Sequence, residues 1–270
     1  MSVGVVAKVD LRETGRSWRL LGLSAAYVFF FAGASAIFVS LGQLPGVVSE
    51  SPSFAGALVS PLELLFPLVG ILLGYRTIVG ERVGGTIRIL LSLPHARREL
   101  VVGKLLSRVV LVSATATLGA TIGYLSQVLF GGSVGGLEYA TVIGLALLLQ
   151  ATFVAIGVGL SAGMESETVV VAAGLGSVLL FAALWQGVVR TLAGVFSAVG
   201  ASSIAEPLTD VLIALNPVLA FSRLASLALD TGGQVTSPWR EWSLPVLVLL
   251  LWLVIPVLLG VKRFERAELS

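Results

Sequence analysis

Residues 139–162 read YATVIGLALLLQATFVAIGVGLSA and contain no acidic or basic side chain. An α-helix rises about 1.5 Å per residue, so roughly 20 consecutive apolar residues are enough to cross the hydrocarbon core of a bilayer. This stretch therefore predicts a transmembrane helix. The fold class of the chain follows from how often such stretches recur.

Five further apolar runs lie on either side of this one. They extend roughly from Leu20 to Leu41, Gly56 to Tyr75, Val109 to Phe130, Thr168 to Val189 and Leu244 to Val261. Only 12% of the 270 residues are charged, whereas soluble domains have about 25%. Backbone exposed to lipid must form helices or closed barrels, and the two-residue alternation of barrel strands is absent. We therefore predict an all-α polytopic membrane protein with six transmembrane helices, folded as one domain over residues 1–270.

Basic residues are distributed unevenly between the loops. Fourteen of the 17 lysine and arginine residues precede the first run, lie between the second and third, or follow the sixth. The other three, Arg190, Arg223 and Arg240, lie between the fifth and sixth runs. Because loops rich in Lys and Arg stay in the cytoplasm, we predict a multi-pass protein of the cell (plasma) membrane. Both termini are expected in the cytoplasm, and a long segment from Arg190 to Trp242 is expected outside.

Part of this external segment, from Leu208 to Leu229, is apolar enough to suggest a seventh span. Its charged residues and the central Asn216-Pro217 pair argue against a crossing, since a central charge costs about 2.5–3.5 kcal/mol on insertion scales. We predict short amphipathic helices at the outer interface instead, with a break at Asn216-Pro217.

The segment between the second and third runs reads ERVGGTIRILLSLP from Glu81 to Pro94. Its apolar residues follow helical spacing, and Pro94 is expected to end the helix. Such a helix would lie flat on the membrane or in a groove of a soluble partner. From the residues alone, an ordinary basic cytoplasmic loop is the favoured explanation of the segment.

This segment resembles the cytosolic coupling segment of ABC-2 type permeases, which are the membrane subunits of ATP-driven transporters. Within that family, the pattern is most similar to the permeases of nitrous oxide reductase maturation systems. The matched positions are Glu81, Gly84, Gly85, Thr86, Leu90, Leu91, Pro94, Arg97, Gly103 and Lys104.

The resemblance implies a coupling helix that docks into a cleft of a separate cytosolic ABC ATPase. The contacts it implies come from Glu81, Gly84, Gly85, Thr86, Leu90, Leu91, Pro94 and Arg97. It further implies two ATPase subunits, a second permease subunit that forms a homodimer, and an amphipathic helix before the first span. Residues Val3 to Arg19 suit such a helix because valines alternate with charged side chains there.

Several kinds of chemistry are excluded by what the sequence lacks. It has no P-loop motif, so ATP hydrolysis would need another subunit. With no cysteine, one histidine and no catalytic signature, we expect no enzyme, cofactor or metal site. The basic loop is explained by the membrane, so nucleic acid is not expected as a partner. We predict a permease subunit that couples a separate ATPase to export or mechanical work; the substrate cannot be read from the sequence.

Two polar residues inside the runs are candidates for function. Glu63 lies between Pro61 and Pro67 in the second run, and an acid within a span is a functional candidate by default. It could equally be an outer-leaflet carboxylate that reaches water. The alternative function is an ATPase-independent secondary transporter or channel with Glu63 as its ion site. Gln150, in the fourth run, is more typical of a hydrogen bond between helices.

Three glycine pairs have the four-residue spacing that lets membrane helices approach closely. They are Gly70 with Gly74, Gly119 with Gly123, and Gly159 with Gly163. We expect these positions at helix crossings.

Overall fold

The computed structural model describes residues 3–15, 17–42, 53–85, 97–130, 132, 134–198, 200, 202–230 and 239–266. All regular structure in these ranges is helical, and six helices are long and apolar enough to cross a membrane. The predicted all-α class with six spans is thereby confirmed. The elements are α1 (Val3–Gly15), α2 (Trp18–Gly42), α3 (Phe54–Gly74), α4 (Val79–Val83), α6 (Arg97–Leu129), α7 (Gly136–Gly163), α8 (Glu167–Leu179), the π-helical turn η2 (Leu180–Leu184), α9 (Trp185–Ala198), α10 (Ser202–Ala214), α11 (Pro217–Asp230) and α12 (Trp239–Arg266).

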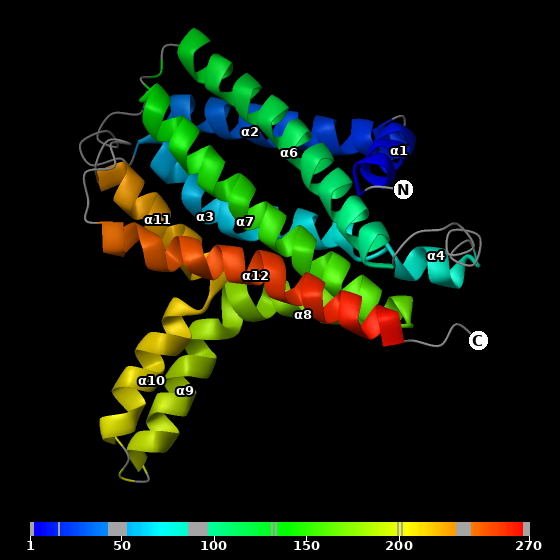
Figure 1. The fold of residues 1–270 in the computed structure, drawn as a ribbon. Coiled ribbons are helices and arrows are strands. Elements are labelled where there is room, and N and C mark those ends of the chain that lie inside the picture. Colours follow the sequence, from blue (N-terminus) through cyan, green and yellow to red (C-terminus); the bar gives the residue numbers. More distant parts are fainter. Residues whose placement is uncertain are drawn as a thin grey trace.

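Helix α7, which contains the stretch quoted first, is the centre of the bundle. It packs against α3, α12 and α11, while α2 packs against α6 (Figure 1). Its side chains are apolar on every face, which is typical of a buried helix. Leu149, Phe153 and Val154 are accordingly inaccessible to solvent.

The predicted glycine pairs lie where helices cross. A Cβ atom built on Gly74 would lie 2.7 Å from the carbonyl oxygen of Val154 in α7. A Cβ atom on Gly119 would lie 2.7 Å from the Cβ atom of Tyr27 in α2. Gly159 abuts Pro256 of α12 in the same way. Each crossing therefore requires a residue without a side chain.

The chain breaks at Asn216-Pro217, as predicted. Helices α10 and α11 meet there at 78°. The Asn216 side-chain oxygen accepts hydrogen bonds from the backbone N–H of Val218 (2.8 Å) and Leu219 (3.2 Å). Its amide nitrogen donates to the carbonyl oxygen of Phe181 at 2.9 Å. Asn216 thus caps α11 and ties the break to the preceding span.

Helix α11 differs from the predicted interfacial helix, because it packs among α3, α7 and α12. Phe221 and Leu224 are fully buried, whereas Arg223 and Asp230 are exposed. The charged residues that argued against insertion fall on one face, so the opposite face is apolar enough to join the bundle. By length and composition the α10–α11 pair is a broken span or a re-entrant loop.

Figure 1 shows α9 and α10 side by side, projecting from the bundle as a helical hairpin. The fifth predicted span continues through the π-helical turn η2 into α9 without interruption. At another end of the molecule lie α1, α4 and the C-terminal end of α12 (Figure 1). The three segments rich in basic residues therefore meet at one end of the bundle.

Candidate functional site

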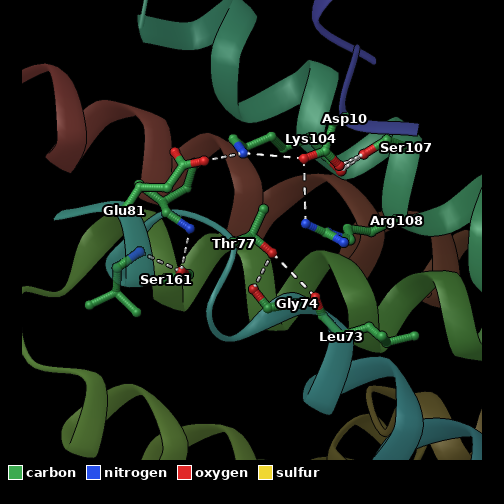
Figure 2. Close-up of polar contacts among 11 residues, drawn as sticks. Asp10, Leu73, Gly74, Thr77, Glu81, Lys104, Ser107, Arg108 and Ser161 are labelled. Atoms are coloured by element: carbon green, nitrogen blue, oxygen red, sulfur yellow. Dashed lines mark hydrogen bonds and ion pairs between the residues drawn. The ribbon is translucent and has the colours of Figure 1, made fainter. Parts of the chain in front are cut away.

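Helix α4 contains the first residues of the predicted coupling helix, which turns at Gly84-Gly85 instead of continuing unbroken from Glu81. The start of α4 is attached to the end of α7 by hydrogen bonds (Figure 2). The backbone N–H groups of Ile78 and Val79 both donate to the Ser161 hydroxyl oxygen, each at 2.9 Å. The Thr77 hydroxyl donates to the carbonyl oxygen of Gly74 at 2.7 Å. All four of the residues Thr77, Ile78, Val79 and Ser161 are buried. The start of α4 is therefore held firmly, because buried donors need these partners.

Two arginines hold the flanks of the coupling segment against the bundle. Arg82 donates to the carbonyl oxygen of Met164 at 2.9 Å, and Arg97 donates to that of Phe264 at 2.6 Å. Both guanidinium groups also lie 5.5 Å from the centre of the Phe264 ring, within the range of a cation–π interaction. Phe264 of α12 therefore contacts one arginine on each side of residues 86–96, namely Arg82 before them and Arg97 after them.

Five side chains from three helices form a largely buried group, called here the charged cluster: Asp10 of α1, Glu81 of α4, and Lys104, Ser107 and Arg108 of α6 (Figure 2). The Lys104 ammonium lies 2.5 Å from Glu81 Oε1 and 3.3 Å from Asp10 Oδ1. Its side chain is only 8% exposed, and that of Asp10 is 9% exposed. Two acids and two bases balance in formal charge, which is the arrangement that a buried site requires.

The α1 side of the charged cluster is the more closely packed. The Ser107 hydroxyl donates to Asp10 Oδ2, and the Arg108 guanidinium lies 3.4 Å from Asp10 Oδ1. A Cβ atom on Gly103 would lie 2.7 Å from the Cβ atom of Val6, so α1 touches the backbone of α6. Gly103-Lys104, part of the matched series, thus has two physical roles. Gly103 lets α1 approach the backbone of α6 closely, and Lys104 forms an ion pair with Asp10 of α1.

Sequence reasoning did not single out Asp10. The signal was available, because Val3, Val6, Ala7 and Asp10 share one face of a helix by their spacing. An acid on the apolar face of an amphipathic helix needs a partner, and Lys104 and Arg108 supply it here.

A cavity of about 930 Å³ borders the charged cluster. Leucines of α2, α3 and α6 form part of its wall, and Asp10, Glu81, Lys104 and Arg108 form another part. The cluster is therefore packed on one side and bordered by open space on the other.

The residues implied by the resemblance have different surroundings. Glu81 and Arg97 face other parts of the chain, as described above. Gly84 and Gly85 are exposed in the turn after α4. Gly85 has a φ of 74°, a conformation that favours glycine. Thr86, Leu90, Leu91 and Pro94 lie outside the described residues.

The two polar candidates inside the spans belong to separate contacts. Gln150 is fully buried and donates a hydrogen bond to the Tyr27 hydroxyl, which joins α7 to α2. Glu63 is half-buried and hydrogen-bonds the Ser222 side chain of α11. Within the described ranges, no group of three or more His, Cys, Asp or Glu side chains could hold a metal ion.

Comparisons with known proteins agree over almost the whole chain. A family model described as "ABC-2 family transporter protein" matches residues 5–269. A Pseudomonas aeruginosa protein named "Probable ABC transporter permease protein NosY" is 27% identical over 268 residues, covering 96% of this chain and 94% of the relative. A Stutzerimonas stutzeri protein of the same name is 25% identical over 272 residues, covering 97% of each.

Proposed function

Since the chain belongs to the ABC-2 family of transporter proteins and is a multi-pass membrane permease of that kind, we propose that it couples ATP hydrolysis in a separate subunit to export or mechanical work. It would be the non-catalytic partner, since the sequence lacks a P-loop. The proposed assembly contains two cytosolic ATPase subunits and two copies of this chain. Each copy would be one permease domain spanning residues 1–270 in the cell membrane, with both termini cytoplasmic.

The observation that supports this proposal best is the attachment of the coupling segment. Ser161 and Met164 at the end of α7 and Lys104 of α6 hold α4, yet the Gly84-Gly85 turn beyond it is exposed. An element with a fixed base and an exposed tip can transmit a push from a soluble partner to the helices behind it. The basic segments at the same end of the bundle favour a cytoplasmic position for this tip.

Co-purification with a P-loop ATPase encoded beside this gene tests the proposal. Gly85→Trp is expected to weaken co-purification strongly, because tryptophan fits neither the positive φ nor a close contact. Gly200→Trp is the matched control, since Gly200 also has a positive φ (77°) and nothing within 4 Å of an added Cβ atom. Equal retention of the ATPase by both variants would contradict docking through this segment.

The alternative, an ATPase-independent transporter or channel, makes a different prediction. The purified chain alone would then dissipate an ion or proton gradient across liposomes, and Glu63→Gln would abolish that flux. Under the proposed function, liposomes holding the chain alone stay as tight as empty ones. Leakage that depends on Glu63 would replace the proposed function with the alternative.

A further inference from the structure

We propose that Lys104 is a positioning residue through which movement of the coupling segment reaches α1 and α6. This inference rests on the proposed function and extends it to a specific route. It assigns to the N-terminal helix α1 a part in coupling, in addition to any role at the membrane surface.

The first support is the pattern of ion pairs. The Lys104 ammonium forms ion pairs both with α1, through Asp10, and with α4, through Glu81. The Lys104–Glu81 distance of 2.5 Å is that of a charge-assisted hydrogen bond. Movement of α4 therefore acts on a side chain that also holds α1.

The second support is the difference between the two halves of the charged cluster. Toward α1, Lys104 is reinforced by Ser107, by Arg108 and by the close approach of Val6 to Gly103. Toward α4, Lys104 holds Glu81 in an ion pair, and Arg108 adds a longer-range electrostatic attraction to the same carboxylate. The remaining hydrogen bonds of α4 and its preceding turn reach Ser161 and Met164 of the α7 end. Breaking Glu81–Lys104 should therefore free α4 from α6 without detaching it from α7.

The third support is the open side of the charged cluster. The cavity of about 930 Å³ is lined by both carboxylates and both cations of the cluster. A buried ion pair in a fully packed site has one arrangement, but a bordering cavity leaves room for the side chains to exchange partners. The cluster can thus follow α4 through a rigid-body movement rather than simply break.

The test uses the absence of cysteine from this chain. Val9→Cys places one thiol on α1 at a half-exposed position, and its maleimide labelling rate reports the surroundings of α1. The rate is measured on the permease–ATPase complex without nucleotide and again with ATP and vanadate. All values are compared at equal amounts of trapped nucleotide, so differences in hydrolysis do not enter.

Two charge-neutral double variants are then measured. Glu81→Gln with Lys104→Met removes the link to α4 and leaves Asp10 paired with Arg108. Asp10→Asn with Arg108→Gln removes the ion pairs with α1 and leaves Glu81 paired with Lys104. Arg76→Gln with Glu167→Gln is the matched control, because this more exposed pair (2.9 Å) lies outside the charged cluster.

We expect nucleotide trapping to change labelling at residue 9 by about fivefold or more in the unaltered background and in the control. Both cluster variants should reduce this change to less than about twofold. A full change in either cluster variant would overturn the role of Lys104. No change in the unaltered complex, despite a bound and active ATPase, would overturn it while leaving the proposed function intact. Failure of any ATPase to bind the unaltered chain would instead refute the proposed function.

Discussion

At the scale of single residues, the molecule depends on positions where either a side chain or its absence is required. Lys104 forms ion pairs with two carboxylates inside the protein, and its side chain is 8% exposed. Gly119 has no side chain, and the backbone of Tyr27 occupies the space that one would need. Substitution should be costly at both kinds of position, for opposite reasons. One leaves charges without a partner, and the other forces two helices apart.

Gly119→Ala should destabilise the protein by about 1–3 kcal/mol, because the added methyl group would collide with α2. Gly144→Ala is the control, since Gly144 also lies within a long helix but has nothing within 4 Å of an added Cβ atom. That variant should be neutral or more stable by up to about 1 kcal/mol, because alanine favours helix. Thermal unfolding in one detergent measures both. A Gly119 variant as stable as the Gly144 variant would show that α2 and α6 can separate freely.

Lys104→Met should destabilise the protein by about 3–5 kcal/mol, because it takes the paired cation from the largely buried Glu81 carboxylate and one of two cations from Asp10. Adding Glu81→Gln should recover part of this loss, since formal charge is balanced again and Asp10 still has Arg108. The two substitutions are therefore expected to be strongly non-additive. Measuring the free energy of unfolding of both single variants and the double variant completes a double-mutant cycle. If the two losses of stability simply add, the two side chains do not interact.

At the scale of elements, the chain uses short, sharply bent pieces where long helices end. The turn after α3 places α4 against α7 through Ser161. Asn216 places α11 at 78° to α10 and fastens the corner to Phe181. In both places, one polar side chain satisfies backbone groups that the change of direction leaves without partners. These contacts fix the directions of α4 and α11.

Asn216→Ala should lower stability by about 2–3 kcal/mol, because it removes a helix cap and leaves the buried Phe181 carbonyl without its donor. Ser226→Ala in the same helix is the control. Ser226 is exposed, and its hydroxyl donates to the carbonyl oxygen of Arg223 within the same helical turn. Its removal should change stability by less than about 0.5 kcal/mol. Equal unfolding temperatures for the two variants would show that Asn216 does not hold the corner.

At the scale of the whole molecule, the segments rich in basic residues gather at one end of the helix bundle. Helices α1 and α4 and the C-terminal end of α12 lie at one end of the bundle (Figure 1), and the segments of the chain that contain them carry most of the basic residues. The α10–α11 pair is the feature that bears on topology. A complete crossing by this pair would place the end of α12 on the opposite side of the membrane from α1. A re-entrant loop would keep both ends in the cytoplasm, as the charge distribution favours.

Single cysteines on the cysteine-free chain decide between these topologies. Ser197→Cys should react with a membrane-impermeant maleimide on intact cells, because the α9–α10 hairpin is expected outside. Glu265→Cys should react only after the cells are permeabilised. Both positions are exposed, so reactivity reports the side of the membrane rather than burial. Labelling of Glu265→Cys on intact cells would establish a seventh crossing.

The sequence by itself determined the class of the protein, the six apolar helices, the break at Asn216-Pro217 and the glycines at the crossings. These features are local. Each depends on neighbouring residues in the chain: the length of an apolar run, the position of a proline or the spacing of two glycines. The surrounding bilayer acts on each run in the same way, so no tertiary contact is needed to predict a span. The matched segment from Glu81 to Lys104 indicated the family for the same reason, because it is continuous in the chain.

Only the tertiary structure decided which polar groups are partners. Asp10 meets Lys104 across 94 positions of the chain, and Gln150 meets Tyr27 across 123. The packing of α11 into the bundle depended on its charges falling together on one exposed face. Such pairings depend on which faces of the helices pack together, and many alternative arrangements of the same helices would bury nearly the same apolar area. The choice among them comes from close packing at glycines and from the cost of a buried charge without a partner.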